Sequence, residues 1–153
     1  MKLIKVGDSA PDFSLKDNRD QIINLSSYRG KKVLLSWHPL AWTSVCTDQM
    51  RSLEVNFEAI QNLNTIPLGL SVDSAPSKKA WSAVLLINHV SLLADFWPHG
   101  KVAQDYGIFI EKLGMSERAN IIIDEKGIVQ WVKVYPMGQL PDIKEVLQVL
   151  SLK

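Results

Sequence analysis

The chain alternates between short apolar runs, typical of buried strands, and apolar positions spaced by three or four, typical of helices. In the central part, the expected strands cover residues 32–37, 66–72 and 91–95. The expected helices contain Met50, Leu53, Phe57 and Ile60 on one apolar stripe, then residues 77–87 after a turn at 73–76. A strand–helix–strand–helix order predicts a sheet with parallel strands.

Both ends of the chain add further elements. The expected strands are an N-terminal hairpin, 12–17 with 21–25, and a later antiparallel pair, 119–124 with 128–135. The expected helices are a short one over 100–106 and a C-terminal one from Pro141 to about Leu150. Together they predict an α/β protein: a three-layer domain over residues 1–153 with a mixed central sheet and an N-terminal β-hairpin extension.

Length and charge narrow the function classes. A chain of 153 residues is long enough to bury one core without a disulfide or metal. Its net charge of +1 offers no electrostatic footprint for nucleic acid or an anionic membrane, so neither is an expected partner. The first eight residues hold no apolar stretch of signal-peptide or membrane length, and the expected location is the cytoplasm.

Cys46 is the only cysteine, and it lies where the strand at 32–37 gives way to a helix. A thiol at a helix N-terminus meets unpaired backbone N–H groups and the positive end of the helix dipole, and both stabilise a thiolate. Cysteine also behaves as a small buried hydrophobe, so a purely structural role is the alternative. A single cysteine excludes an internal disulfide.

The helical spacing places Cys46 on the apolar stripe, four residues before Met50. We therefore expect the thiol to face the sheet, in a pocket at its rim. Thr43 or Ser44 is the expected N-cap, because a short hydroxyl accepts hydrogen bonds from the first helical turn.

Other chemistries lack their motifs. The three histidines, His38, His89 and His99, do not have metal-ligand spacing, and one cysteine is too few for a structural zinc site. The eight glycines form neither a phosphate loop nor a dinucleotide fingerprint. We expect neither a metal nor a cofactor.

The segment Trp37-His38-Pro39-Leu40-Ala41-Trp42-Thr43-Ser44-Val45-Cys46-Thr47 resembles the peroxidatic loop of the peroxiredoxins, thiol peroxidases with a thioredoxin-like fold. The family motif is Pro, then Thr or Ser, then Cys at these spacings. Further similar segments, in the same order, are Ala10-Pro11-Asp12-Phe13, Ser71-Val72-Asp73-Ser74, residues 93–100, residues 103–107 and residues 117–124.

The resemblance implies a role for each matching residue. Cys46 would be the nucleophile that becomes a sulfenic acid. Thr43 would orient the peroxide, and backbone N–H groups near Val45 and Cys46 would donate to it. Arg118 would supply a permanent positive charge, and Pro39 would shield the thiolate from bulk water. The alternative for Arg118 is a surface ion pair with a nearby carboxylate: Glu117, Asp124 or Glu125.

Four further residues, Gln49, His38, Trp42 and Trp81, bear on the expected site. Gln49 stands where many relatives carry Glu, and its amide can still accept from Arg118 in a supporting role. His38 replaces an aromatic residue, and a packed histidine is favoured over a general base. Trp42 and Trp81 resemble positions near the active-site pocket and the subunit contact, although burial inside one chain suits the sequence equally well.

The absence of a second cysteine defines the expected cycle. With no resolving cysteine, the reducing thiol must come from outside: a thioredoxin, a glutaredoxin or a low-molecular-weight thiol such as glutathione. The expected substrate is hydrogen peroxide or an organic hydroperoxide, and the resemblance implies a homodimer. A thioredoxin-like disulfide oxidoreductase is disfavoured, because Thr43 replaces the first cysteine of a Cys-x-x-Cys pair. A non-catalytic redox-sensing or binding module with the same fold remains the alternative.

Overall fold

A computed structural model describes residues 2–152, and its centre is a five-stranded mixed sheet of order β5-β4-β3-β8-β9. Three strands are parallel: β3 (Lys32–Trp37), β4 (Thr65–Ser71) and β5 (Ser91–Ala94). The other two are antiparallel to their neighbours: β8 (Arg118–Ile123) and β9 (Val129–Tyr135). This is the expected thioredoxin-like arrangement of a mixed central sheet.

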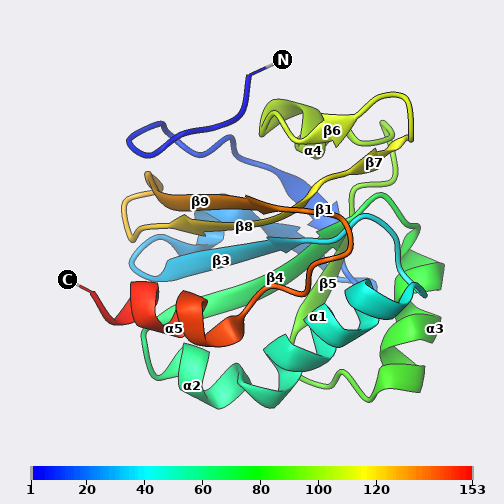
Figure 1. Ribbon diagram of the computed structural model, residues 1–153, viewed down its shortest axis with the longest axis horizontal. Helices are drawn as coiled ribbons and strands as arrows, with labels where there is room; N and C mark the ends of the chain where they lie inside the picture. Colours follow the sequence, from blue (N-terminus) through cyan, green and yellow to red (C-terminus); the bar gives the residue numbers. More distant parts are fainter. Residues whose placement is uncertain (1, 153) are drawn as a thin grey trace.

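Helices cover both faces of the sheet, which gives the three expected layers (Figure 1). One face packs against α1 (Ser44–Val55), α2 (Phe57–Gln61), α3 (Ala75–Leu85) and α5 (Ile143–Ser151). The other face packs against α4 (Lys101–Asp105) and the N-terminal segment. Alternate residues of β3 divide between the two cores, Val33 and Leu35 on one side and Leu34 on the other, as the pleat of a doubly covered strand requires.

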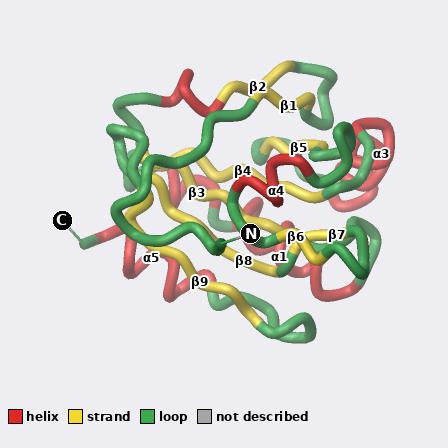
Figure 2. The backbone as a smooth tube through the Cα atoms, turned by 90° about the horizontal axis from the view of Figure 1, so that it is seen from above, coloured by secondary structure: helices red, strands yellow, loops and turns green. Residues whose placement is uncertain are grey.

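The N-terminal hairpin lies beside the free edge of β5. It pairs β1 (Ser14–Lys16) with β2 (Ile22–Asn24), which lie beside β5 in Figure 2. An isolated bridge joins Asp17 to Leu93. A 3₁₀ turn, η1 (Leu25–Tyr28), then leads to β3. The hairpin is therefore a separate two-stranded sheet at the edge of the central one, the N-terminal extension that the sequence predicts.

Four details differ from the sequence-based expectations. The long helix after Cys46 is divided at Asn56 into α1 and α2. The helix expected from residue 77 begins at Ala75, because Ser74 provides the cap and accepts from Ser77 N. The last helix begins at Ile143, with Asp142 as its cap, and Pro141 lies outside it. A second small hairpin, β6 (Phe109–Ile110) with β7 (Met115–Ser116), was not expected.

The sheet register brings two distant segments together. Since β8 runs antiparallel to β3, the end of β3 pairs with the start of β8, and Trp37 is opposite Ala119. The loop that carries Cys46 leaves β3 at this end, and Arg118 is the first residue of β8. Over the described residues, no helix is both long and apolar enough to cross a membrane.

Candidate active site

Cys46 lies in the first turn of α1, where it forms part of the wall of a pocket. Its side chain is buried, with 1% of the residue exposed. The pocket encloses about 260 Å³, and its lining residues come from the cysteine loop, β7, β8 and the segment after β9: Pro39, Leu40, Thr43, Ser44, Val45, Cys46, Met115, Arg118 and Met137. The thiol therefore faces inward at the rim of the sheet, as the helical spacing predicts.

Arg118 reaches the sulfur directly. Its Nη1 donates to Cys46 Sγ at 3.3 Å and to Gln49 Oε1 at 2.9 Å. The guanidinium is buried, and over residues 2–152 it forms no ion pair with a carboxylate. The surface-pair alternative for Arg118 is therefore wrong. A guanidinium keeps its proton at every physiological pH, so this contact places a permanent positive charge against the sulfur.

The backbone carbonyl of Met137 anchors the other side of the guanidinium. Arg118 Nε donates to Met137 O at 3.1 Å, and Nη2 donates to the same oxygen at 2.8 Å. With the bonds to Cys46 and Gln49, four hydrogen bonds use four of the five N–H donors of the arginine. The fifth, on Nη2, has no partner among the described residues, and Arg118 is one of the residues that line the pocket.

Gln49 is held in one orientation by its own amide nitrogen. Its Nε2 donates to Ser36 Oγ at 2.8 Å and to Trp37 O at 3.1 Å, so its Oε1 faces Arg118. Two hydrogen bonds donated to β3 and one accepted from Arg118 suit an amide, since a carboxylate has no N–H to donate to Trp37 O. The expected supporting contact with Arg118 is present.

Thr43 occupies the N-cap position of α1, but its hydroxyl does not cap the helix. It donates to Leu40 O at 2.8 Å, and no side chain caps the first turn. The predicted hydroxyl cap is therefore wrong: Thr43 stands at the N-cap position, but its hydroxyl accepts no hydrogen bond from the first turn of α1. Because Thr43, Val45 and Cys46 all line the pocket, the uncapped N-terminal turn is at the pocket itself. Unpaired first-turn N–H groups and the helix dipole favour negative charge there.

A second set of contacts supports the cysteine loop from outside the pocket. The Asp73 carboxylate accepts from Ala41 N at 2.8 Å and from the Ser71 hydroxyl. Pro39, which is buried, lines the pocket beside Thr43. The middle of the loop is therefore fixed by the carboxylate of Asp73, two residues after the end of β4. Asp73 belongs to the segment Ser71-Val72-Asp73-Ser74 that resembles the family, but sequence reasoning gave it no role.

His38 and two tryptophans do not line the pocket. The His38 ring is fully buried against Trp81, with ring centroids 5.4 Å apart, and Lys78 Nζ lies 2.6 Å from its Nε2. Trp81 belongs to the core and does not line the pocket. Trp42 is 52% exposed, with Nε1 donating to Ser77 Oγ. Neither tryptophan therefore lines the pocket, although Trp81 belongs to the same buried cluster as Cys46.

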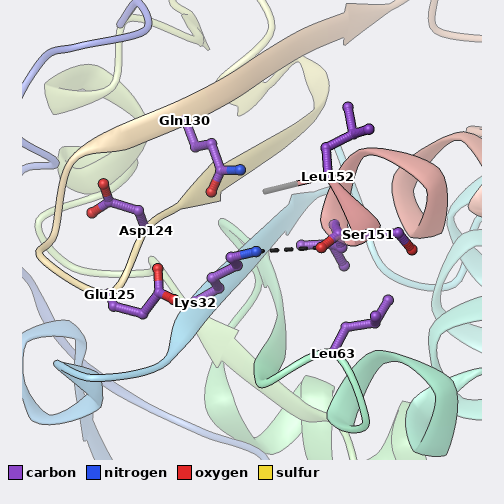
Figure 3. Close-up of a pocket in the computed structure, with 8 residues that line it drawn as sticks. Lys32, Leu63, Asp124, Glu125, Gln130, Ser151 and Leu152 are labelled. Carbon is purple, nitrogen blue, oxygen red and sulfur yellow. Dashed lines mark hydrogen bonds between the residues drawn. The ribbon is translucent and has the colours of Figure 1, made fainter.

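A larger cavity, of about 500 Å³, lies at the opposite end of β3 (Figure 3). There Lys32 Nζ donates to the carbonyl oxygen of Leu150. Asp124, Glu125 and Gln130 also line this cavity. Its lining includes neither Cys46 nor Arg118. We therefore assign the chemistry to the smaller pocket.

The described residues show no group of three or more His, Cys, Asp or Glu side chains placed to hold a metal ion. Each of the three histidines has a different partner. His38 contacts Lys78, His89 Nδ1 is 2.7 Å from Glu54 Oε2, and His99 Nε2 is 2.6 Å from Gly114 O.

Sequence reasoning missed Met115 and Met137 in the pocket wall, and Ser36 behind Gln49. Met115 belongs to the unexpected β7, and Met137 acts on Arg118 through its backbone carbonyl, which leaves no signature in a sequence. The one available signal was Ser36, a polar residue that interrupts the apolar run of β3 after Val33, Leu34 and Leu35.

A thioredoxin-like sheet with a buried, arginine-paired thiol in the first turn of a helix defines the class of thiol-dependent peroxidases. Residues 6–132 match the model of the AhpC/TSA family. The chain belongs to this family, the peroxiredoxins, and its single cysteine makes it a one-cysteine type that reduces peroxide with an external thiol.

Individual relatives agree with this assignment. Alkyl hydroperoxide reductase E of Mycobacterium tuberculosis is 36% identical over 141 residues, which cover 92% of each chain. The thiol peroxidase of Oceanobacillus iheyensis is 35% identical over 148 residues, which cover 96% of this chain and 88% of the relative. The crystal structure of reduced 2-Cys peroxiredoxin from Plasmodium vivax superimposes with a TM-score of 0.86 and 30% identity, covering 95% of this chain and 79% of the other.

Proposed function

We propose that Cys46 is the peroxidatic nucleophile and that Arg118, Thr43 and Pro39 complete the reacting site. The observation that carries this proposal is the 3.3 Å contact between Arg118 Nη1 and Cys46 Sγ inside the pocket. Gln49 supports Arg118, and the backbone N–H groups near Val45 and Cys46 donate to the bound peroxide.

In the proposed step, the Cys46 thiolate attacks the terminal oxygen of the peroxide. The S–O bond forms while the O–O bond breaks, so sulfur is oxidised to a sulfenic acid and the peroxide is reduced. The second oxygen leaves as alkoxide or hydroxide and takes up one proton. The remaining Nη2 donor of Arg118 and the uncapped first turn of α1 stabilise the charge on that oxygen.

The pocket wall favours organic hydroperoxides over hydrogen peroxide. Leu40, Met115 and Met137 line it together with Pro39 and Val45, so an alkyl group meets apolar side chains. Burying each methylene contributes about 0.8 kcal/mol. Hydrogen peroxide has no carbon and gains none of this.

For the reductant, we propose thioredoxin, a glutaredoxin or a low-molecular-weight thiol, and for the location the cytoplasm, where such thiols are kept reduced. A panel of thiol donors in a turnover assay distinguishes the reductants. Rapid turnover with one donor identifies it.

We also propose that the chain forms a homodimer. Phe96 and Trp97, which are 51% and 81% exposed, line a surface hollow together with Pro76. Trp42 adjoins the same end of α3 through Ser77. Exposed aromatic residues of this kind are enriched in interfaces, and the expected partner is a second copy. Sedimentation velocity of wild type and Trp97→Asp tests this: a dimer that Trp97→Asp converts to monomer supports it.

Stopped-flow mixing of reduced protein with peroxide tests the assignment of Cys46. We expect rapid oxidation at one site, trapped as sulfenic acid and located by mass spectrometry, and we expect Cys46→Ser to abolish it. Oxidation no faster than that of a free thiol would instead support the non-catalytic redox-sensing or binding module.

A further inference from the structure

The peptide group between Leu40 and Ala41, in the cysteine loop, is hydrogen-bonded at both ends. Its N–H, on Ala41, donates to Asp73 Oδ2 at 2.8 Å. Its C=O, on Leu40, accepts from the Thr43 hydroxyl, also at 2.8 Å. The N–H and the C=O belong to one planar amide, so they move together. Asp73 and Thr43 are therefore linked through a single rigid unit.

The side chain of Asp73 is itself fixed to the central sheet. Ser71 is fully buried and is the last residue of β4, where it pairs with Ala94 of β5. The Ser71 hydroxyl donates to Asp73 Oδ2, and Asp73 N lies 3.4 Å from Ser71 Oγ as a donor. The oxygen that holds the cysteine loop is thus attached to a strand end in the core.

The loop needs this support, because Trp42 has a left-handed backbone conformation. Its φ is 73°, a value that bulky side chains rarely adopt and that persists only where the surrounding contacts impose it. The bond from Asp73 fixes the preceding residue, Ala41. Trp42 itself donates from Nε1 to Ser77 Oγ at 3.1 Å. The loop is therefore held at two successive residues, directly before the threonine.

The Leu40 carbonyl determines which hydrogen bonds the Thr43 hydroxyl can still make. A hydroxyl has one proton to donate and two lone pairs that accept, and Leu40 O takes the proton. Since Thr43 lines the pocket, it can offer a ligand there only an acceptor. Donation from Ala41 N to a carboxylate polarises the amide, so the carbonyl holds the threonine proton more firmly.

We propose that Asp73 is a positioning residue of the peroxidase site: through the peptide group that begins at Ala41 N, it holds the Thr43 hydroxyl in place as an acceptor for the peroxide O–H. In an organic hydroperoxide the terminal oxygen carries the only O–H proton, and this is the oxygen that the thiolate attacks. A bond to Thr43 therefore orients the reacting oxygen, and the proton stays on that oxygen in the sulfenic acid. Asp73 does not line the pocket and does not touch the peroxide.

Two substitutions at Asp73 separate its hydrogen bond from its charge. Asp73→Asn keeps an oxygen that can accept from Ala41 N, whereas Asp73→Ala removes the acceptor. In stopped flow with cumene hydroperoxide, we expect the rate constant for oxidation of Cys46 to fall about ten- to thirtyfold in Asp73→Ala. Asp73→Asn should stay within about threefold of wild type. An Asn variant as slow as the Ala variant would overturn the proposal.

The matched control for the lost carboxylate is Asp48→Ala, at an exposed position of α1. It should react with cumene hydroperoxide at the wild-type rate. If it slowed as much as Asp73→Ala, the effect would be one of net charge, and the positioning role would be rejected.

Modification of Cys46 by methyl methanethiosulfonate separates positioning from general damage to the loop. This reagent carries neither O–H nor N–H, so it donates nothing to Thr43. We expect its rate to agree within about twofold in wild type, Asp73→Asn and Asp73→Ala. A purely structural role would displace the thiol and change both reactions together, and that result would contradict the proposal.

A double-mutant cycle tests the route through the threonine. Thr43→Val removes the hydroxyl and keeps a branched side chain of similar size. If Asp73 acts through that hydroxyl, Asp73→Ala should slow peroxide oxidation by less than about twofold in the Thr43→Val background. Losses that multiply in the double variant would show two independent effects and would reject the link.

The bond to Asp73 can also be measured in chains that keep it. By NMR, the Ala41 amide of reduced wild type and of Thr43→Ser should exchange its proton slowly with solvent. In Thr43→Val the peptide group loses one of its two anchors, and exchange should be at least about threefold faster. Exchange in wild type at the rate of an unbonded amide would overturn the proposal even if Asp73→Ala failed to fold.

This inference rests on the proposed roles of Cys46 and Thr43, and the two can fail separately. Loss of peroxide reduction in Cys46→Ser tests the proposed function. A wild type that is oxidised rapidly by peroxide, with Asp73→Ala reacting equally fast, would reject the positioning role of Asp73 alone.

Discussion

Arg118 Nη1 bonds to both Cys46 Sγ and Gln49 Oε1, although arginine and cysteine are 72 positions apart in the chain. The antiparallel register of β3 and β8 produces this contact, because it places the start of β8 beside the loop that leaves β3. One buried cation therefore donates hydrogen bonds to both the sulfur and an amide oxygen. The amide is neutral, so it does not compete with the sulfur for the positive charge of the arginine.

Removing that cation should slow the reaction more than it harms the fold. For Arg118→Ala we expect peroxide oxidation of Cys46 to fall by about two to three orders of magnitude, because both the thiolate and the leaving oxygen lose a donor. Stopped-flow fluorescence measures the rate. Arg51→Ala, which removes an arginine bonded to Leu85 O at the surface, should react at the wild-type rate. Equal slowing in both variants would contradict a specific role for Arg118.

Gln49→Leu should affect stability and rate together. It leaves Trp37 O and Ser36 Oγ without their donor and frees the Arg118 side chain from one contact. Each unsatisfied buried polar group costs about 1–3 kcal/mol, so we expect a lower free energy of unfolding in urea. The rate should fall about tenfold, less than in Arg118→Ala, because Met137 O still anchors the guanidinium. Gln61→Leu, at an exposed position of α2, is the control.

The stability of the reduced protein should rise with pH above neutrality. Burial depresses the folded-state pKa of Lys78 to about 7, while the unfolded chain binds the same proton up to about pH 10. Between these values the unfolded state holds more protons, so raising the pH favours the folded state. Below about pH 7 both states are protonated and this gain is lost.

Urea unfolding of wild type, Lys78→Met and Lys79→Met at several pH values measures the effect. The rise above neutrality should be absent only in Lys78→Met. If wild type and Lys78→Met have parallel pH profiles, the buried charge does not influence stability.

Met115→Ser should change substrate preference. Met115 lines the pocket, and replacing its thioether with a hydroxymethyl group removes apolar surface that an alkyl group would contact. With about 0.8 kcal/mol for each methylene, we expect roughly a tenfold loss in kcat/KM for cumene hydroperoxide. The value for hydrogen peroxide should stay within about twofold. Leu113→Ser, at an exposed residue of the same hairpin, should leave both values unchanged. Equal losses for both peroxides would reject an apolar alkyl site.

Much of this arrangement follows from local sequence patterns. The apolar run of β3, the loop through Pro39 and the stripe from Cys46 to Met50 predict a thiol in the first turn of an inward-facing helix, and the structure has it there. The contact between Arg118 and the thiol was implied by family resemblance, because no local pattern reports the register between β3 and β8. Strand pairing over 72 positions is a tertiary property.

Other features depend on competition between partners that a sequence does not rank. The Thr43 hydroxyl can cap α1 or bond to its own loop, and in the structure it donates a hydrogen bond to the nearby Leu40 carbonyl. From the sequence, Lys78 is a helical lysine of the kind expected at the surface. Only its burial against His38 and Trp81 in the structure distinguishes it from its exposed neighbour Lys79. Such choices are decided by packing, after the elements have formed.

Met137 has two structural roles in the site. Its carbonyl oxygen fixes the guanidinium of Arg118, while the residue also lines the pocket. Every amino acid carries the same carbonyl, so a substitution at position 137 keeps the acceptor for Arg118 and changes the pocket lining. Under the proposed function, the anchoring of the arginine and the shape of the peroxide pocket can therefore be altered independently.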